Sequence, residues 1–206
     1  GGDLGTVTVD GDAPDLASVA AADDAYGVGE TISITVTWDE AVVVTGTPTL
    51  TLSNAATATY SSGTGSTALV FTYTVAEGNT ASNDLSVSSY AGTITDAAGG
   101  AAAAASGDLG TVTVDGDAPD LASVAAGDGT YGLGDAVAIT VTFDEAVIVS
   151  GSPTLTLSNG AAASYTSGSG STALVYTYTV SVGQTDTGDL LISSNSGGTI
   201  TDAAGG

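Results

Sequence analysis

The sequence predicts an all-β protein built from tandem antiparallel β-sandwich domains, and three observations support this. Short runs of β-branched and aromatic residues alternate with polar residues, as in strands with one buried face. Clusters of Gly, Asp, Ser and Asn separate these runs. The stretch "GDLGTVTVDGDAPDLASVAA" begins at Gly2 and again at Gly107, and the rest of the repeat follows at the same interval of 105 residues until one extra residue near positions 195–197 makes it 106. Such an interval is too long for a solenoid repeat and suits a tandem array of domains.

The strands of the first repeat can be placed from their alternation. "TISITVTW" at residues 31–38 puts its Ile and Val side chains and Trp38 on one face, and "ALVFTYTV" at residues 68–75 has the same period. About seven or eight short strands per repeat, separated by Gly-containing turns, are typical of an antiparallel sandwich. No helix is needed. Shorter strands are expected at residues 16–20, 42–45, 49–52, 58–60, 85–87 and 93–95.

The domain limits follow from a proline in the repeated stretch. Pro119 would interrupt a ladder of strand hydrogen bonds, so we expect the boundary between Asp115 and Pro119. "GTVTV" at residues 110–114 then closes the first sandwich, and the identical residues 5–9 close a preceding repeat or act as a donor strand. The predicted division is residues 1–10 for that strand, 11–115 for the first sandwich, and 116–206 for a second sandwich without its own final strand.

The charge of the chain excludes several kinds of partner. It contains 23 acidic residues and no Lys, Arg or His, which gives a formal charge of -23. Binding to nucleic acid or to an anionic membrane surface requires cationic side chains, so we expect neither. Its apolar runs are shorter than the about 18 residues of a membrane span, and we expect no membrane insertion. Self-repulsion on this scale favours an extracellular setting rich in salt or calcium.

Catalysis is difficult to build from these residue types. Without His, Cys or Lys, catalytic triads, Schiff bases and imidazole acid–base chemistry are excluded. "DTG" at residues 186–188 resembles the catalytic tripeptide of aspartic proteases, but the first repeat has no such tripeptide to face it at residues 81–83. Asp39 and Glu40 could form a glycosidase pair, but adjacent strand residues point apart. We therefore expect no enzyme.

Acidic residues are expected to gather at the end of each sandwich where the chain enters it. The strand at residues 31–38 returns to the end at which "DGDAP" enters, and the loop "EGNTASND" is expected to finish there too. Converging carboxylates repel unless a cation intervenes, and Ca²⁺ takes six to eight oxygen ligands. The sequence thus predicts calcium sites near the domain junction. The candidate ligands are Asp10, Asp12, Asp39, Glu40 and Asp84 in the first repeat and Asp115, Asp117, Asp144, Glu145 and Asp189 in the second.

A simpler interpretation of these acids remains open. They can be solvated loop residues, with Asp12 and Asp117 favouring a turn ahead of a proline. The spacing is not that of an EF-hand, because no Glu stands at the position that would close a loop beginning at Asp10.

Nearly the whole chain resembles the tandem immunoglobulin-like (Big-type) repeats of giant bacterial surface proteins and the extender regions of adhesins. The resemblance is carried by "DGDAP", "DDAYGVGETISITVTWDEAVVVTGTPTLTL", "ATYSSGTGSTALVFTYTV" and "GTITDAAGG". It implies immunoglobulin-like sandwiches at the cell surface that act as stalks, often stiffened by calcium between domains.

From these observations we expect a structural, non-catalytic segment of an extracellular bacterial stalk or fibre. Its partners would be further copies of the repeat, joined head-to-tail in a filament. The junctions are either covalent, through a stretch such as residues 101–106, or made by separate chains that exchange strands. The alternative is a carbohydrate- or cell-binding adhesion module that recognises surface glycans. Against that alternative, the two copies are nearly identical even in their loops.

Overall fold

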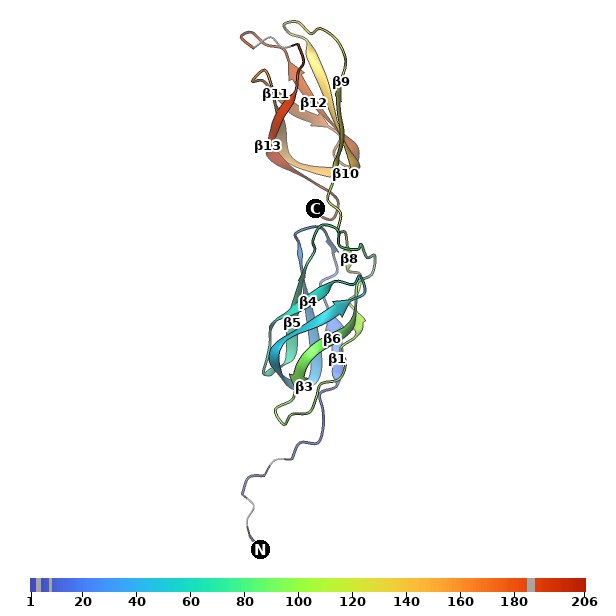
Figure 1. Ribbon diagram of the computed structural model, residues 1–206, viewed down its shortest axis with the longest axis vertical. Coiled ribbons are helices and arrows are strands. Elements are labelled where there is room, and N and C mark those ends of the chain that lie inside the picture. The colour runs from blue at the N-terminus through green and yellow to red at the C-terminus, as the bar shows by residue number, and fades with distance from the viewer. Residues whose placement is uncertain (3–4, 8, 185–187) are drawn as a thin grey trace. The chain divides into compact units, whose positions relative to one another are not determined.

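The computed structural model describes residues 1–2, 5–7, 9–184 and 188–206. It divides the chain into two compact units, Gly1–Asp117 and Ala118–Gly206. Both consist of strands and turns (Figure 1), and the sheets are antiparallel apart from one two-residue pair. This confirms the predicted all-β class, and each unit is consistent with a β-sandwich. The described residues contain no helix long and apolar enough to cross a lipid bilayer.

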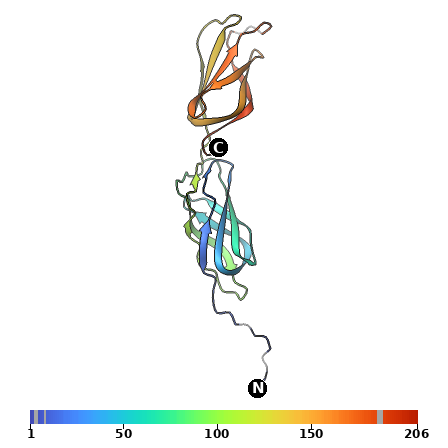
Figure 2. The same cartoon turned by 180° about the vertical axis from the view of Figure 1, so that it is seen from behind.

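The first unit is organised around one long strand. Its strands are β1 (Leu16–Ala20), β2 (Ala25–Tyr26), β3 (Thr31–Leu52), β4 (Thr57–Ser62), β5 (Ser66–Thr74), β6 (Ser86–Thr95), β7 (Gly107–Asp108) and β8 (Thr113–Val114). The first half of β3 pairs with β1 and β5, and its second half pairs with β4 and β6. The blue β1 is best seen from behind (Figure 2). By changing partners along its length, β3 closes the sheet around a core.

The second unit repeats this arrangement. Its strands are β9 (Leu121–Ala126), β10 (Ala136–Leu157), β11 (Ala162–Ser167), β12 (Ser171–Thr179) and β13 (Ile192–Thr201). Strand β10 pairs with β9 and β12 along its first half and with β11 and β13 along its second half. Strands β9 to β13 therefore correspond to β1, β3, β4, β5 and β6.

Each unit has its own hydrophobic core, formed by the side chains that the alternation predicted. In the first unit Trp38 and Phe71 are fully buried, and the edge of Tyr60 meets the ring of Phe71 at a centroid distance of 5.9 Å. In the second unit Tyr165 and Tyr176 form the equivalent pair, 5.8 Å apart. Such edge-to-face pairs stabilise a core beyond the area that they bury.

The strand limits differ from the expectation in two places. The runs at residues 31–38, 42–45 and 49–52 form the single strand β3, and those at 85–87 and 93–95 are parts of β6, which begins at Ser86. Strand β3 absorbs the intervening residues with irregular register between Thr37 and Val42 and between Thr45 and Thr49. Bulges of this kind bend a strand without ending it.

The predicted closing strand at residues 110–114 is also wrong in extent. Only Thr113–Val114 pairs there, in parallel with β2, and a separate short strand, Gly107–Asp108, pairs with β6. Between them Gly110 has a φ of 92°, and its N–H donates to the carboxylate of Asp108. This turn interrupts the strand. The closing role of the segment is nevertheless clear, because Leu109, Val112 and Val114 are buried in the core of the first unit.

Candidate metal centre

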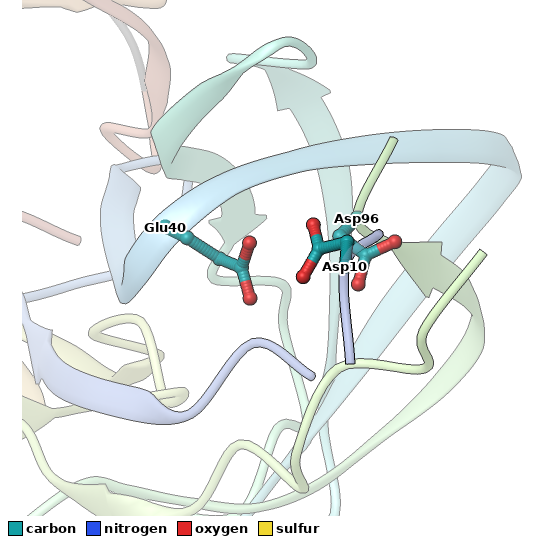
Figure 3. Close-up of side chains that lie close together, drawn as sticks. All are labelled: Asp10, Glu40 and Asp96. Carbon is teal, nitrogen blue, oxygen red and sulfur yellow. The ribbon is translucent and has the colours of Figure 1, made fainter. Parts of the chain in front are cut away.

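Three carboxylates of the first unit lie together at the point where β3 changes partners. Asp10 comes from the leading segment, Glu40 from β3, and Asp96 from the turn that follows β6 (Figure 3). One oxygen from each lies within 4.8 Å of the others. The Glu40 side chain extends from its strand towards Asp10 and Asp96. We call these three residues the acidic cluster.

Asp96 is the most buried member of the acidic cluster, with 3 % of its surface exposed. Its Oδ1 accepts hydrogen bonds from the backbone N–H groups of Ala98, Gly99 and Gly100, at 2.7, 2.6 and 2.8 Å. Its Oδ2 is buried and has no hydrogen-bond partner. Because an unsatisfied buried carboxylate oxygen is costly, this atom is the strongest sign that the cluster takes a ligand.

Gly100 leaves the space around that oxygen open. A Cβ placed on Gly100 would collide with Asp96 Oδ2 and would come within 3.2 Å of the backbone oxygen of Asp12. The absence of a side chain at position 100 therefore keeps a carboxylate oxygen and a backbone carbonyl oxygen close together. Both are ligand types that Ca²⁺ accepts.

The surroundings of Glu40 in the acidic cluster change the pKa of its carboxyl group. Partial burial raises the pKa of its carboxyl group, and the negative charges of Asp10, Asp96, Asp39 and Asp12 raise that pKa further. The chain has no cationic side chain that could neutralise these acids. The repulsion must therefore be reduced by a bound proton, by a bound metal ion or by screening from dissolved salt.

Asp39 and Asp12 lie beside the acidic cluster but have other contacts. Asp39 Oδ1 accepts the N–H of Asp15 at 2.9 Å, and the N–H of Asp39 donates to the Asp15 carbonyl at 3.1 Å. These bonds fix the start of β1 against β3. The N–H of Asp12 donates to Asp10 Oδ1 at 3.4 Å. The structure thus brings Asp10 and Glu40 into the cluster and gives Asp39 a structural contact.

Asp84 does not join the cluster, and our expectation that its loop ends there is wrong. Strand β5 is antiparallel to the first half of β3, and its last residue, Thr74, pairs with Thr31. The loop after β5 therefore starts at the Thr31 end of the unit, away from Glu40. It stays at that end, because Ser82 pairs with Val114, next to Tyr26. By the same argument Asp189 follows β12, whose Thr179 pairs with Ala136 at the start of β10.

Sequence reasoning missed Asp96 as a candidate ligand. A signal was present, because "TDAAGG" occurs at residues 95–100 and again at 201–206. An Asp followed by small residues can bond to the backbone N–H groups just after it. What the sequence does not reveal is that this turn lies beside Glu40.

The second repeat carries the same residue types at the equivalent sequence positions, Asp115, Glu145 and Asp202. Within the second unit, Asp202 repeats the pattern of Asp96. Its Oδ1 accepts the N–H groups of Ala204, Gly205 and Gly206, and its buried Oδ2 has no hydrogen-bond partner.

Two other predicted ligands of the second repeat make the same hydrogen bonds as their counterparts in the first repeat. Asp144 Oδ1 accepts the N–H of Asp120 at 2.8 Å, as Asp39 does that of Asp15. The N–H of Asp117 donates to Asp115 Oδ1 at 3.2 Å. The recurrence of these contacts shows that they follow from the repeated sequence. The "DTG" tripeptide falls partly outside the described residues.

Comparisons of the chain with models of protein families, with curated proteins and with solved structures found no match in any of the three.

Proposed function

We propose that this chain is a structural, non-catalytic segment of an extracellular bacterial stalk or fibre, and that its acidic cluster binds calcium. The observation that carries the proposal is the buried Oδ2 of Asp96, which has no hydrogen-bond partner and belongs to a carboxylate that lies beside those of Asp10 and Glu40, in a chain without basic side chains. An all-oxygen set of carboxylates and a nearby backbone carbonyl suits a hard cation such as Ca²⁺.

Calcium at the acidic cluster would connect parts of the chain that are far apart in sequence. Asp10 lies before β1, Glu40 lies within β3, and Asp96 lies after β6. An ion bound to all three would hold the leading segment against the body of the unit. Stiffening of the segment that enters a repeat is what a stalk needs, because free rotation there would let the stalk bend.

The near-identity of the two repeats supports a structural role. Three features recur in both repeats. They are the edge-to-face aromatic pair, the carboxylate of Asp39 or Asp144 that accepts an N–H just before the first strand, and the turn held by the carboxylate of Asp96 or Asp202. A repeated load-bearing unit requires this kind of uniformity, whereas a specific recognition site needs only one specialised copy.

The proposal is tested by calorimetric titration of the 206-residue chain with CaCl₂, with MgCl₂ as the control ion. Extracellular calcium modules bind with a Kd of about 0.1–1 mM, and a hundredfold excess over Kd would stabilise the folded state by about 2.7 kcal/mol. Glu40→Gln should remove the site of the first unit. Glu77→Gln changes the same charge at an exposed residue in the loop after β5 and should leave binding unchanged.

Two results would count against parts of the proposal. Calcium binding that Glu40→Gln does not reduce would place the ion elsewhere. A glycan array with clear hits would favour the adhesion-module alternative over the stalk.

A further inference from the structure

The second unit contains an apolar groove that the corresponding part of the first unit does not expose. The groove has a volume of about 1660 Å³ and is lined by residues of β9, β10, β12 and β13 and of the loops that follow β9 and β12. Its walls include Leu121, which is 60 % exposed, and the half-buried Phe143 and Leu190. In the first unit the equivalents of the last two, Trp38 and Leu85, are fully buried.

In the first unit, residues 107–114 cover the place that corresponds to this groove. Their side chains Leu109, Val112 and Val114 are buried in the core. The N–H of Leu85 donates to the Val112 carbonyl at 2.9 Å, and the N–H of Leu109 donates to the Leu85 carbonyl at 3.3 Å. We call residues 107–114 the closing segment.

The sequence of the closing segment, "GDLGTVTV", occurs at one other place in the chain, residues 2–9. Two of the valines that are buried in the closing segment have exposed counterparts there. Val7 and Val9 are 63 % and 87 % exposed, whereas their counterparts Val112 and Val114 are 0 % and 3 % exposed. The chain thus contains a second copy of the closing sequence, in which Val7 and Val9 are exposed, and a groove in the second unit at the place that the closing segment covers in the first.

We propose that the groove of the second unit binds residues 2–9 of a second copy of this chain, in the way that the first unit binds its own closing segment. The addition of an extended segment to a sheet edge is an established mode of protein association. Donor and acceptor belong to different parts of the chain, so the contact is heterologous and can propagate into a filament. This inference goes beyond the proposed calcium-binding role and does not depend on it.

The first unit also predicts the register of this contact. Gly107 pairs with Val87, so Gly2 is expected opposite Ile192. Leu85 bonds to the carbonyl of Val112, so Leu190 is expected to bond to that of Val7. A polar contact fixes the register further. Asp23 Oδ1 accepts the N–H of Thr111 at 2.8 Å, and its counterpart in the second unit is Asp128, which would accept the N–H of Thr6.

The shape of the closing segment explains why it fits. A Cβ on Gly107 would lie 3.4 Å from Cγ2 of Val19, so the segment comes close to β1 where it carries a glycine. Val124 is the counterpart of Val19 and is 45 % exposed. A larger side chain at position 124 should therefore block Gly2 while leaving the core of the second unit intact.

The test uses sedimentation velocity of the 206-residue chain in chelator, so that calcium plays no part. The wild-type chain should form species whose size increases with concentration. Val7→Asn should abolish this, because it places an unpartnered amide at a position that is fully buried in the first unit. Thr6→Asn introduces the same side chain next to it, where the counterpart Thr111 is exposed, and should assemble like the wild type.

A mixing experiment identifies the two halves of the contact. Val124→Trp should also remain monomeric by itself, since its groove is blocked while its residues 2–9 are intact. An equimolar mixture of Val7→Asn and Val124→Trp should form a one-to-one complex, because one supplies the groove and the other the segment. If the mixture remains monomeric, the proposal is wrong.

A synthetic peptide of residues 1–10 separates a second copy from the chain's own terminus. The peptide should bind the Val7→Asn chain, and a peptide that itself carries Val7→Asn should bind at least tenfold more weakly. If the wild-type chain is monomeric at every concentration, no second copy binds, and the proposal is overturned. In that case the peptide shows what fills the groove. If it binds the Val7→Asn chain but not the monomeric wild type, the groove of the wild type is occupied by the chain's own residues 2–9.

Discussion

The two carboxylate oxygens of Asp96 have different surroundings. Oδ1 accepts three backbone N–H groups and so fixes the turn after β6, while Oδ2 is buried without a hydrogen-bond partner, in a carboxylate that lies beside Asp10 and Glu40. The first oxygen stabilises the fold, and the second has no structural use in the chain alone. A substitution that preserves the first and changes the second separates the two roles.

Asp96→Asn is such a substitution. The amide oxygen can keep the three N–H bonds, and the amide NH₂ replaces Oδ2 as a donor towards the two remaining carboxylates. We expect a variant that is at least as stable as the wild type in chelator, because one of three clustered charges is gone. In excess calcium it should lose the gain of about 2.7 kcal/mol expected at a hundredfold excess over Kd. Thermal unfolding followed by Trp38 fluorescence measures both, since the chain has a single Trp.

Glu77→Gln is the matched control for Asp96→Asn, because it removes one negative charge far from the cluster. It should keep the full calcium-dependent rise in Tm. An equal rise in Asp96→Asn would show that Oδ2 is not a ligand.

Glu40 makes the stability of the first unit depend on pH. Burial and the surrounding carboxylates raise its pKa above the ordinary value of 4.5 in the folded state. The folded state therefore keeps a proton that the unfolded state has released. Its contribution to stability is greatest below pH 4.5 and is lost as the pH rises through the raised pKa.

The measurement is Tm in chelator as a function of pH, from pH 4.5 upwards. The Tm of the wild type should fall with rising pH more steeply than that of Glu40→Gln. With calcium present the difference should diminish, because the ion replaces the proton. Parallel curves for the two proteins in chelator would contradict this account.

Among the structural elements, the hairpin between β4 and β5 has a strict requirement at one glycine. Gly63 has a φ of 112°, and a Cβ there would overlap the backbone oxygen of Ala68 and lie 2.9 Å from Cα of Leu69. Gly65 has a φ of 84° but open space around it. Both conformations are strained for other residues, but only the first is also blocked by backbone atoms.

Gly63→Ala should therefore destabilise the first unit by about 3 kcal/mol or more, and Gly65→Ala by about 1 kcal/mol. Urea unfolding followed by Trp38 fluorescence gives both values. Equal losses would mean that the hairpin can shift to accommodate a methyl group at Gly63.

The closing segment provides a second prediction at this scale. Val112 is fully buried and its sequence twin Val7 is exposed. Val112→Ala should destabilise the first unit by about 2 kcal/mol through lost burial and a small cavity. Val7→Ala should leave the stability of that unit unchanged, although the local sequence is the same. A loss from Val7→Ala measured by Trp38 fluorescence would show that residues 2–9 support the first unit.

These elements also show how much the sequence can predict. Alternation located the core strands, because burial of every second side chain is a local property. It could not show that residues 31–52 form one strand, since the bulges after Thr37 and Thr45 depend on pairing with β5 and β6. Likewise Asp10 and Glu40 were found from chain direction, whereas Asp84 was misplaced because the path of β5 was traced to the wrong end.

On the scale of the whole molecule, the two units have separate cores, and only the first contains a Trp. We expect two calorimetric transitions, of which Trp38 fluorescence follows one. The second unit should unfold at the lower temperature, because the side chains that line its groove are more exposed than their counterparts. The measurement should use the Val7→Asn variant, because the addition of residues 2–9 from a second copy would raise the unfolding temperature of the second unit. A single transition that coincides with the Trp38 signal would contradict independent unfolding.

The places where the chain enters and leaves the first unit have a mechanical consequence. Strand β1 begins at Leu16 opposite Trp38, while the closing segment ends with Val114 beside Tyr26, near the start of β3. A pulling force applied through the chain therefore acts along the strands, at opposite ends of the unit. Hydrogen bonds between antiparallel strands lie perpendicular to that direction. Tension would load the ladder between β1 and β3 in shear, so that its bonds share the force and rupture together instead of opening one by one.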